Sequence, residues 1–411
     1  MKEVILFVSY LLVSVQISAA TFFVGKGQHF KNIRSAIEYA AEGDTIMVSS
    51  GHYHEAELVV EKRLTLIGLD YPVLDGDYKY EVLTLNASHC AVIGFEICRT
   101  GTSSTQEIAG LKVQSADYVI IESNRFRDCT FGIYLSRSDH CVISNNDIQG
   151  IIKEEQNSGN GIHLWNCAEA LIEGNNVSGQ RDGIYFEFVN NSEITSNNSE
   201  RNLRYGLHFM FSHEDKYHHN RFYQNGAGVA VMYSRKVEMT ENEFGYNWGS
   251  AAYGILLKEI TDSYISSNVF EHNSAAVFME GASRIILEQN IFKENGWALR
   301  IQASCDANVI RENNFFSNSF DVSTNGHLVL NSFEHNYWDR YEGYDLNHDG
   351  IGDIPYRPVS LYAIVVERMP YGLMFMRSIM VYLMDKAEKI IPSLTPEQLV
   401  DKMPAIKSLE F

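Results

Sequence analysis

Short apolar strands recur along most of the chain at a spacing close to 22 residues. One repeated unit is Asn-x-apolar, and a second is a Gly or Ala that begins an apolar-x-apolar strand. The first unit begins at Asn124, Asn146, Asn175, Asn197, Asn220, Asn242, Asn268, Asn290, Asn314 and Asn336. The second begins at Gly132, Gly161, Gly183, Gly206, Gly228, Gly254, Ala276 and Ala298. Departures from the period fall between the two units, as at residues 153–160, so they are predicted to be loop insertions in one elongated body.

Strand alternation without crossover helices predicts an all-β fold, a right-handed parallel β-helix with coils of about 22 residues over residues 21–340. The Leu-x-x-Leu-x-Leu frame of leucine-rich repeats is missing. Residues 29–53 predict a short helix and a first strand that cap one end. The aligned asparagines are predicted to form an amide ladder, and a set of phenylalanines is predicted to stack inside. These are Phe126, Phe222, Phe244, Phe270, Phe292 and Phe316.

The strand that follows each Gly or Ala has two apolar positions, the first and the third, which are predicted to point inward. The second and fourth positions are then predicted to form an exposed stripe. The second positions are Tyr134, His163, Tyr185, His208, Ala230, Leu256, Phe278 and Arg300. The fourth positions are Ser136, Trp165, Glu187, Met210, Met232, Lys258, Glu280 and Gln302.

Soft donor atoms gather on this stripe. Met210 and Met232 occupy equivalent positions on neighbouring coils, roughly 4.8 Å apart, and His208 shares the strand and face of Met210. These three side chains are predicted to converge on one ion, and thioether with imidazole suits Cu(I). His163 lies two coils from His208, roughly 10 Å away, too far to share that ion without movement.

The histidines that follow this strand form a separate candidate. His213, His218 and His219 lie in the stretch predicted to be the adjoining turn, where they would supply a second or transit copper site. The same outward stripe also suits protein docking, through a partner-facing surface of Trp165, Tyr185 and Glu187. Copper binding and partner docking both remain open at this point.

Composition narrows the function classes. The chain has 52 acidic and 33 basic residues, a net charge of −19, which disfavours an extended nucleic-acid footprint. Residues 1–20 read as an export signal, because an apolar run precedes the small residues Ser18-Ala19-Ala20. The mature chain is therefore expected outside the cytoplasm. Six cysteines show no CxxC pair; they are either small buried residues of the coils or disulfide partners, with Cys98 and Cys129 the first pair to test.

Residues 341–357 are rich in Asp and Gly. Asp345, Asn347 and Asp349 match the start of a calcium loop, and Asp353 adds a later ligand. Tyr356 stands where a calcium loop would carry its final Glu. A structural calcium ion and a plain Asx/Gly turn are both consistent with this pattern.

The composition shifts again in residues 358–411, where the Asn turns disappear. Pro370 and Gly372 divide an apolar run into two predicted helices, and Ser393 is predicted to begin a short third helix. Charged residues interrupt the run, so a stable membrane span is not expected. The segment is interpreted as a cap on the last coil, as a docking element for a membrane protein, or as both. Its docking candidates are Met369, Met374, Met376, Met380 and Met384.

Many parallel β-helices act on polysaccharides, so binding or cleavage of a polysaccharide is the alternative function. That chemistry needs paired carboxylates at a matched separation. Glu187 and Glu280 are four coils apart on the stripe, and no tight acidic cluster occurs on the regular strands. Polysaccharide lyase, hydrolase or epimerase chemistry therefore ranks second.

Several sequence blocks together resemble the NosD family of periplasmic β-helix proteins. The blocks include "RYGLHFMFSH" (204–213), "NGAGVAVMYS" (225–234), "NGWALRIQ" (295–302) and "DGIGDIPYRPVSLYAIVVERMP" (349–370). The resemblance covers nearly the whole chain beyond residue 20. It implies a non-enzymatic, periplasmic subunit docked on an ATP-binding-cassette transporter with a permease (NosY) and an ATPase (NosF).

The same resemblance implies a role in assembling the copper centres of nitrous oxide reductase (NosZ), with a copper chaperone (NosL) as donor. Whether copper or a sulfur species is delivered stays open, and no ligand residue is carried over from the family. His348 stands where similar proteins tend to carry an acid, which weakens the calcium interpretation.

Overall fold

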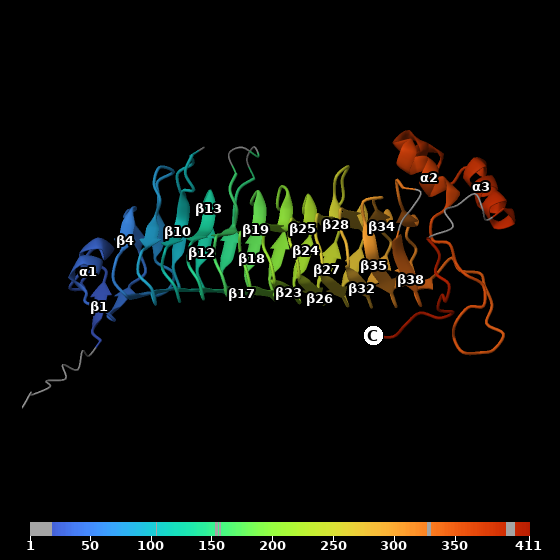
Figure 1. Cartoon of the computed structure of the whole chain (residues 1–411). Helices are drawn as coiled ribbons and strands as arrows, with labels where there is room; N and C mark the ends of the chain where they lie inside the picture. Colours follow the sequence, from blue (N-terminus) through green and yellow to red (C-terminus); the bar gives the residue numbers. More distant parts are fainter. Residues whose placement is uncertain (1–18, 104, 153–154, 156–157, 327–329, 392–398) are drawn as a thin grey trace, which may run out of the picture.

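The protein is an elongated solenoid with helices at its two ends, as the computed structural model shows (Figure 1). The structure describes all residues except 1–18, 104, 153–154, 156–157, 327–329 and 392–398. The export signal and the helix predicted from Ser393 therefore fall largely outside the described residues. Within the described part, three parallel sheets run the length of the body, which confirms the parallel β-helix prediction.

Each coil contributes one short strand to each sheet, and each strand pairs in parallel with the equivalent strand of the next coil. The fourteen-strand sheet contains β1 (Thr21–Val24), β2 (Thr45–Val48), β5 (Thr65–Gly68), β8 (Ala91–Ile93), β11 (Ile120–Glu122), β14 (Val142–Ser144), β17 (Leu171–Glu173), β20 (Glu193–Thr195), β23 (Lys216–His218), β26 (Glu238–Thr240), β29 (Tyr264–Ser266), β32 (Ile286–Glu288), β35 (Asp306–Arg311) and β38 (Leu330–Glu334).

The thirteen-strand sheet contains β3 (His52–Tyr53), β6 (Val73–Asp75), β9 (Glu96–Cys98), β12 (Arg125–Arg127), β15 (Asp147–Gln149), β18 (Asn176–Ser178), β21 (Asn198–Glu200), β24 (Arg221–Tyr223), β27 (Glu243–Gly245), β30 (Val269–Glu271), β33 (Ile291–Lys293), β36 (Asn314–Phe316) and β39 (Tyr337–Trp338). The twelve-strand sheet contains β4 (Leu58–Val60), β7 (Leu83–Leu85), β10 (Ala109–Gln114), β13 (Phe131–Ser136), β16 (Ile162–Trp165), β19 (Asp182–Glu187), β22 (Tyr205–Met210), β25 (Ala227–Met232), β28 (Tyr253–Lys258), β31 (Ala275–Glu280), β34 (Trp297–Ile301) and β37 (Phe320–Ser323).

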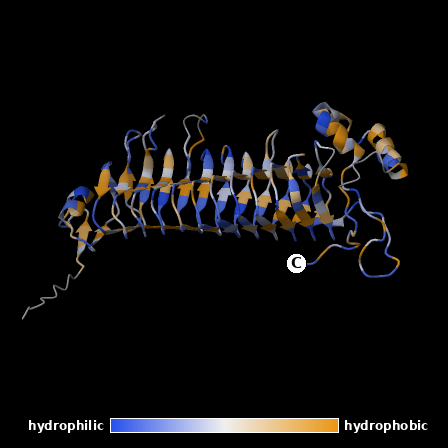
Figure 2. Ribbon diagram, in the orientation of Figure 1, coloured by the Kyte–Doolittle hydropathy of each residue, from blue (hydrophilic) through white to orange (hydrophobic). Residues whose placement is uncertain are grey.

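The core is a continuous column of side chains that alternation along the strands turns inward. The first and third positions of the strands in the twelve-strand sheet are buried in every coil, as predicted. Figure 2 shows hydrophobic residues recurring in the strands along the solenoid. The six cysteines are buried and free, so they pack as small core residues. Burying this column supplies the hydrophobic stabilisation that a single coil cannot provide alone.

Two ladders of buried asparagines hold neighbouring coils together. In the first ladder each Asn Oδ1 accepts hydrogen bonds from the backbone N–H and side-chain amide of the preceding member, as at Asn197, Asn220 and Asn242. The prediction was wrong by one residue at Asn314, because Asn313 continues the ladder between Asn290 and Asn336. Asn314 instead begins β36 and bonds Leu409 in the C-terminal tail.

The aromatic stack inside the solenoid shows the same one-residue shift. Phe270, Phe292 and Phe315 stack with ring centroids 4.9 and 4.8 Å apart, and Trp338 continues the stack at 4.1 Å. Phe316, predicted to be the inward residue, is only half-buried because neighbouring strand residues face opposite sides. The other predicted members are fully buried.

The second ladder was missed by the sequence analysis. It runs through Asn202, Asn225, Asn247, Asn273, Asn295 and Asn318. Each of these lies five residues after a member of the first ladder, and that fixed offset was the signal that identifies it. The two ladders lie at two corners of each coil and satisfy backbone groups that would otherwise be buried without a partner.

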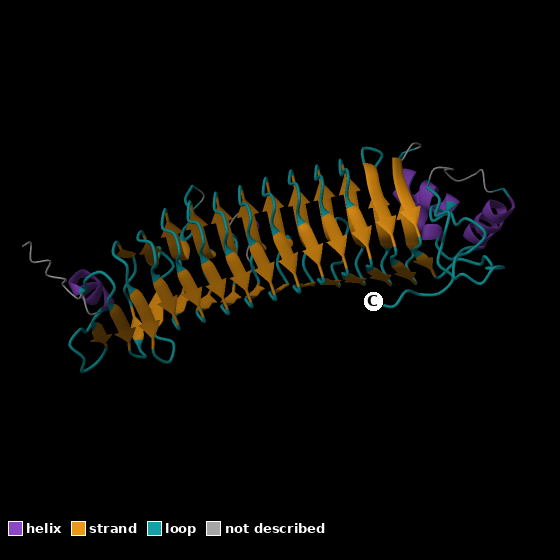
Figure 3. Cartoon of the chain, turned by 60° about the horizontal axis from the view of Figure 1, so that its bottom comes forward, coloured by secondary structure: helices purple, strands orange, loops and turns teal. Residues whose placement is uncertain are grey.

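Helices close the two ends of the solenoid (Figure 3). Helix α1 (Ile33–Tyr39) begins at Asn32, whose side chain accepts from Ser35 N, and it buries Ile33, Ala36 and Ile37 against the first coil. This confirms the predicted N-terminal cap. At the other end, α2 (Leu361–Arg368), the 3₁₀ helix η2 (Pro370–Phe375) and α3 (Ile379–Ile390) follow the last coils.

The C-terminal segment divides into two parts with different roles. Helix α2 packs on the last coils, where Tyr362 contacts Phe320 of β37 and Glu367 pairs with Arg300 of β34 at 2.9 Å. After residues 392–398, the chain returns to the solenoid, and Asp401 bridges to Phe333 and Tyr356. The prediction of one helical docking segment over 358–411 is therefore corrected, because its last residues belong to the end of the solenoid. No helix within the described residues has the length and apolarity needed to cross a membrane.

Candidate copper site

The backbone register places the predicted soft donors as expected. Strands β22 and β25 pair with Met210 opposite Met232 and His208 opposite Ala230. Tyr185 of β19 lies opposite His208, and His163 of β16 lies opposite Tyr185. His163 and His208 are thus two coils apart with a tyrosine between them, so they do not share one ion.

The structure corrects the expectation that this stripe is exposed. His163 and His208 point outward from their strands, yet they are only 7% and 6% exposed. The His208 ring is packed between Tyr185 and Tyr205, with centroids 4.8 Å from each. The His163 ring is packed between Tyr134 and Tyr185. Aromatic side chains at the same position of successive coils lie close enough to cover each other, which alternation along one strand cannot reveal.

His208 faces a buried ion pair. Its Nδ1 lies 3.5 Å from Asp182 Oδ2, a long contact, and Asp182 is held by Arg204 at 2.6 Å. Burial raises the pKa of Asp182, but the contacts with His208 and Arg204 outweigh it and lower the pKa to about 2. Neither ring nitrogen of His208 has a well-formed hydrogen bond within the described residues. Both ring nitrogens therefore keep hydrogen-bonding or ligating capacity that the neighbouring side chains do not use.

The methionines are more accessible than His208. Met210 and Met232 are half-buried, and in the same register Glu187 lies on one side of them and Lys258 on the other. Two thioethers on adjacent strands, with an imidazole two residues along one strand, make up a donor set for a soft monovalent ion. The register brings these residues together, and a common ligand role for the three remains a prediction.

The surface predicted to face a partner borders a hollow of about 440 Å³ on the same sheet. Tyr185, Glu187, Arg181 and His163 line it, and Trp165 is half-buried nearby under Arg137. His163 Nδ1 lies within hydrogen-bonding distance of Asn160 Nδ2, at 3.3 Å. Its Nε2 has no hydrogen-bond partner among the described residues. Burial, with the nearby Arg181, lowers the pKa of His163 to about 3, so this imidazole is neutral.

The three histidines that follow β22 do not lie in one turn. His213 bridges neighbouring coils and is half-buried, with its pKa lowered by burial. His218 ends β23 in the fourteen-strand sheet, and His219 follows it with a positive φ of 55°. Both face a different side of the solenoid from His208. Their carboxylate partners, Glu193 and Glu241, were missed because they lie on the two adjacent coils rather than nearby in sequence.

The Asp/Gly-rich loop is closed by its own hydrogen bonds. Asp345 accepts from the backbone N–H groups of Asp349 and Gly350, and Asp353 accepts from Leu346. Burial raises the pKa of Asp345, but these backbone donors outweigh it and lower the pKa overall. Asn347 and Asp349 bond each other at 2.9 Å. The Asx/Gly turn accounts for these contacts, and a calcium ion at this loop remains a prediction.

The candidate docking methionines divide into exposed and covered residues. Met369, Met374 and Met380 are 62%, 84% and 56% exposed, and Met376 is 37% exposed. Met384 is half-buried against the small core that joins α2 to β37. Tyr371 and Ile379 add to the exposed apolar surface of η2 and α3.

One further cluster of metal-binding residue types lies near the N-terminal end. His52, His54 and Asp75 form the one group of three or more His, Cys, Asp or Glu side chains with converging ligand atoms in the described part of the chain. Arg99 already binds both carboxylate oxygens of Asp75. This guanidinium opposes a cation at the same carboxylate.

Fold and site together define a parallel β-helix protein with a helical appendage at one end and soft donors on one side sheet. Solved β-helix structures match it at the level of the fold. The catalytic unit of an α-1,3-glucanase from Streptomyces thermodiastaticus is 13% identical with a TM-score of 0.61, covering 74% of this chain and 65% of its own. The adhesin PfbA of Streptococcus pneumoniae is 12% identical with a TM-score of 0.58, covering 71% and 89%.

The sequence comparisons are more specific. Residues 149–343 match the model of a family described as "Periplasmic copper-binding protein (NosD)". A "Probable ABC transporter binding protein NosD" from Pseudomonas aeruginosa is 28% identical over 389 residues, 89% of each chain. Its namesake from Stutzerimonas stutzeri is 25% identical over 417 residues, 96% of this chain and 94% of its own. The chain is thus similar to these two NosD proteins over most of its length, and its central part matches the NosD family model.

Proposed function

We propose that this protein is a non-enzymatic, periplasmic subunit of an ABC transporter that binds copper for assembly of the copper centres of nitrous oxide reductase. The family description and the names of the two relatives support copper binding and association with a transporter. The permease and ATPase (NosY and NosF) would anchor the subunit, a chaperone (NosL) would donate copper, and the reductase (NosZ) would receive it.

The observation that carries the proposal is the register of Met210 opposite Met232, with His208 on the same face of β22. Thioether and imidazole donors stabilise Cu(I) relative to harder ions. Copper would be the transported ion and would take part in no reaction on this protein. The chain's own residues would bind it, and Tyr185 and Tyr205 would shield His208 from water. The half-buried methionines leave one side of the pair accessible to a donor protein.

A Cu(I) titration against a chromophoric chelator under reducing conditions tests this site. The double variant Met210→Leu/Met232→Leu removes both sulfur atoms while keeping most of the side-chain volume. We expect it to lose one equivalent of Cu(I) or to weaken binding at least tenfold. Met380→Leu, which removes an exposed sulfur on α3, is the matched control and should bind as the unmodified chain does. Unchanged stoichiometry and affinity in the double variant would exclude these residues as the site.

We propose that η2 and α3 form the surface that docks on the permease. Most large apolar side chains of η2 and α3 are exposed, and exposed apolar side chains concentrated in one segment are typical of interaction sites. Contacts of α2 with β37 would transmit the position of the transporter to the solenoid. In this arrangement the solenoid is a stiff arm that presents its side sheet to soluble partners.

Polysaccharide binding or cleavage is the second candidate. The observation that favours it is the hollow on the twelve-strand sheet, because Glu107 and Glu187 both line it together with Arg181 and Tyr185. Glycoside hydrolysis uses a pair of carboxylates. A reducing-sugar and binding screen against acidic and neutral polysaccharides tests it, and no turnover or binding would reject it.

A further inference from the structure

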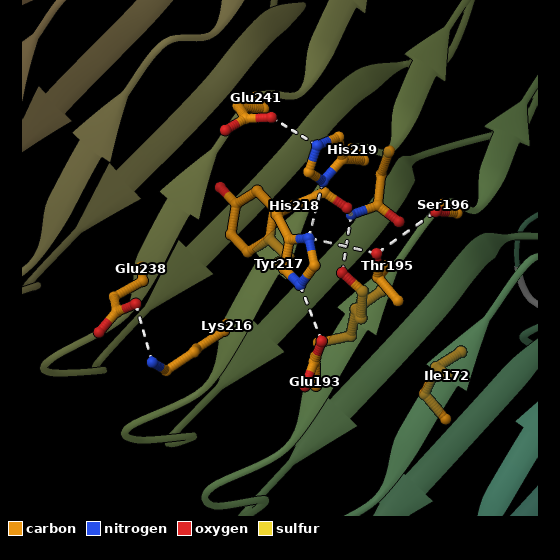
Figure 4. Close-up of polar contacts among 12 residues, drawn as sticks. Ile172, Glu193, Thr195, Ser196, Lys216, Tyr217, His218, His219, Glu238 and Glu241 are labelled. Carbon is orange, nitrogen blue, oxygen red and sulfur yellow. Dashed lines mark hydrogen bonds and ion pairs between the residues drawn. The ribbon is translucent and has the colours of Figure 1, made fainter.

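His218 and His219 form a paired-imidazole cluster with two carboxylates on the neighbouring coils (Figure 4). His218 Nε2 lies 2.8 Å from Glu193 Oε1, and His219 Nε2 contacts Glu241 Oε2. The two Nδ1 atoms lie 2.8 Å apart. Four residues from three consecutive coils thus meet at one corner of the fourteen-strand sheet.

Backbone geometry causes this convergence. Tyr217 points into the core and His218 points outward, as alternation along β23 requires. Strict alternation would turn His219 inward, but its positive φ of 55° breaks the alternation and directs its ring outward. The residue before each Asn of the first ladder has this conformation, so Ser196, His219 and Glu241 lie in one row.

The hydrogen bonds around His218 and His219 do not provide a donor for both Nδ1 atoms. An ionised carboxylate only accepts hydrogen bonds, so each Nε2 must carry its proton toward Glu193 or Glu241. In a neutral imidazole the other nitrogen then carries a lone pair, so two Nδ1 lone pairs lie close together unless a proton is shared between them. The Thr195 hydroxyl, 3.2 Å from His218 Nδ1, can satisfy only one of them. A proton shared by the two nitrogens, or a metal ion bound beside both of them, removes the conflict.

We infer that His218 and His219 bind a Cu(II) ion through their Nδ1 atoms. Nitrogen–metal bonds of ~2.05 Å place two donors at a right angle ~2.9 Å apart, which agrees with the observed 2.8 Å. Right-angle donors suit the tetragonal geometry of Cu(II), whereas tetrahedral donors lie ~3.3 Å apart at the same bond length. Thr195 Oγ1 is placed to be a third, weaker ligand.

The surroundings support an exchangeable metal site. A carboxylate on the distal nitrogen of each ligating histidine sets its tautomer and strengthens it as a donor, and Glu193 and Glu241 are so placed. The His219 side chain is 55% exposed and that of His218 is 28% exposed, so an ion can enter from solvent. Lys216, on the same strand as His218, is paired with Glu238 at 3.1 Å.

This inference extends the proposed copper role to a second oxidation state and a second sheet. The site lies on the fourteen-strand sheet, apart from Met210 and Met232 on the twelve-strand sheet. Imidazole donors favour Cu(II), and thioethers favour Cu(I). Binding is a ligand exchange in which hexa-aqua Cu(II) loses water, with no change in oxidation state.

The test is a titration of the metal-free chain with Cu(II), followed by electron paramagnetic resonance and by competition with a chelator of known affinity. We expect one equivalent with coupling to two imidazole nitrogens. His218→Ala/His219→Ala should abolish that signal, and Glu241→Gln should weaken binding tenfold to a hundredfold. His272→Ala is the matched control, because His272 contacts Glu294 at 3.2 Å and its ring neighbour is Tyr246 rather than a histidine.

An unmodified chain that binds no Cu(II), or a double variant that binds it unchanged, would overturn the inference. Circular dichroism and urea unfolding of the double variant show whether the coil remains intact. Met210→Leu/Met232→Leu should keep the Cu(II) spectrum while losing Cu(I). If the unmodified chain binds Cu(II) but not Cu(I), the proposed Cu(I) site fails and the paired-imidazole site stands. If it binds Cu(I) but not Cu(II), the paired-imidazole site fails and the proposed Cu(I) site stands.

Discussion

Asp401 completes the asparagine ladder that ends at Asn336. Its Oδ2 accepts hydrogen bonds from Asn336 N at 3.0 Å, from Asn336 Nδ2 at 3.1 Å and from Trp338 Nε1 at 3.1 Å. Asp401 is fully buried and lies 65 residues from Asn336 in sequence. A residue from the C-terminal tail thus occupies the place that the next coil's Asn would take, and the solenoid ends with its donors satisfied.

Replacement of Asp401 tests this cap. Asp401→Ala leaves three buried donors without an acceptor, and each unsatisfied donor costs about 1–3 kcal/mol. We expect the free energy of unfolding to fall by about 3 kcal/mol or more, measured by urea denaturation. Asp401→Asn keeps an acceptor oxygen like the ladder members, so it should cost much less. Equal losses in the two variants would show that the oxygen is not the essential feature.

The same contact dictates how permease docking should be tested. Removing residues 358–411 would remove Asp401 with the helices, so lost association would not distinguish docking from unfolding. Point variants are cleaner: Met374→Ser/Ile379→Ser changes side chains that are 84% and 80% exposed. We expect reduced co-purification with the permease and ATPase, and an unchanged unfolding curve.

Ile151→Ser is the matched control for that docking experiment. Ile151 is 59% exposed on a loop of the solenoid, far along the chain from the C-terminal helices. It tests whether any exposed isoleucine contributes to association. Full association of the Met374→Ser/Ile379→Ser variant would exclude this surface.

Asp321 is predicted to make stability pH-dependent between about pH 4 and pH 6. Burial raises its pKa to about 6, although Arg340 lowers it in part. Because the folded protein holds this proton more tightly than the unfolded chain, stability falls as the pH rises from about 4 through 6. Asp321→Asn should therefore stabilise the protein at pH 8 by about 2–3 kcal/mol and have little effect near pH 4. Chemical unfolding at both pH values measures the difference, and an equal effect at both would contradict the assignment.

His163 should act in the opposite direction. Its pKa is lowered to about 3, chiefly by burial, so the folded protein excludes a proton that the unfolded chain binds below pH 6.5. Its contribution is present above pH 6.5 and is lost on acidification, by about 3 kcal/mol at pH 4. Asp182 and His208 face the same region, and the lowered pKa of Asp182 affects only lower pH.

His163→Phe removes the titrating ring while filling the space between Tyr134 and Tyr185. We expect the stability of this variant to change less between pH 7 and pH 4 than that of the unmodified chain. His140→Phe, at a half-exposed histidine stacked on Tyr118, is the control. The same pH slope in all three proteins would contradict a neutral buried His163.

Periodicity could predict the coils because each strand repeats one local rule. Inward positions alternate with outward ones, and the Asn units recur at nearly constant spacing. The prediction slipped by one residue at Asn314 and Phe316 because both Asn313 and Asn314, and both Phe315 and Phe316, satisfy the pattern. Only the contact with the preceding coil selects Asn313 and Phe315.

The candidate sites show where such reasoning ends. The sequence alone determined the solenoid, the helical C-terminal segment and the alignment of Met210 with Met232, since these follow from local periodicity. Tertiary structure decided that His208 is covered by tyrosines of its own and an adjacent coil, that Asp401 ends the ladder, and that His218 and His219 meet Glu193 and Glu241. The physical reason is that burial and electrostatics depend on side chains from other coils, and a single positive φ redirects one of them.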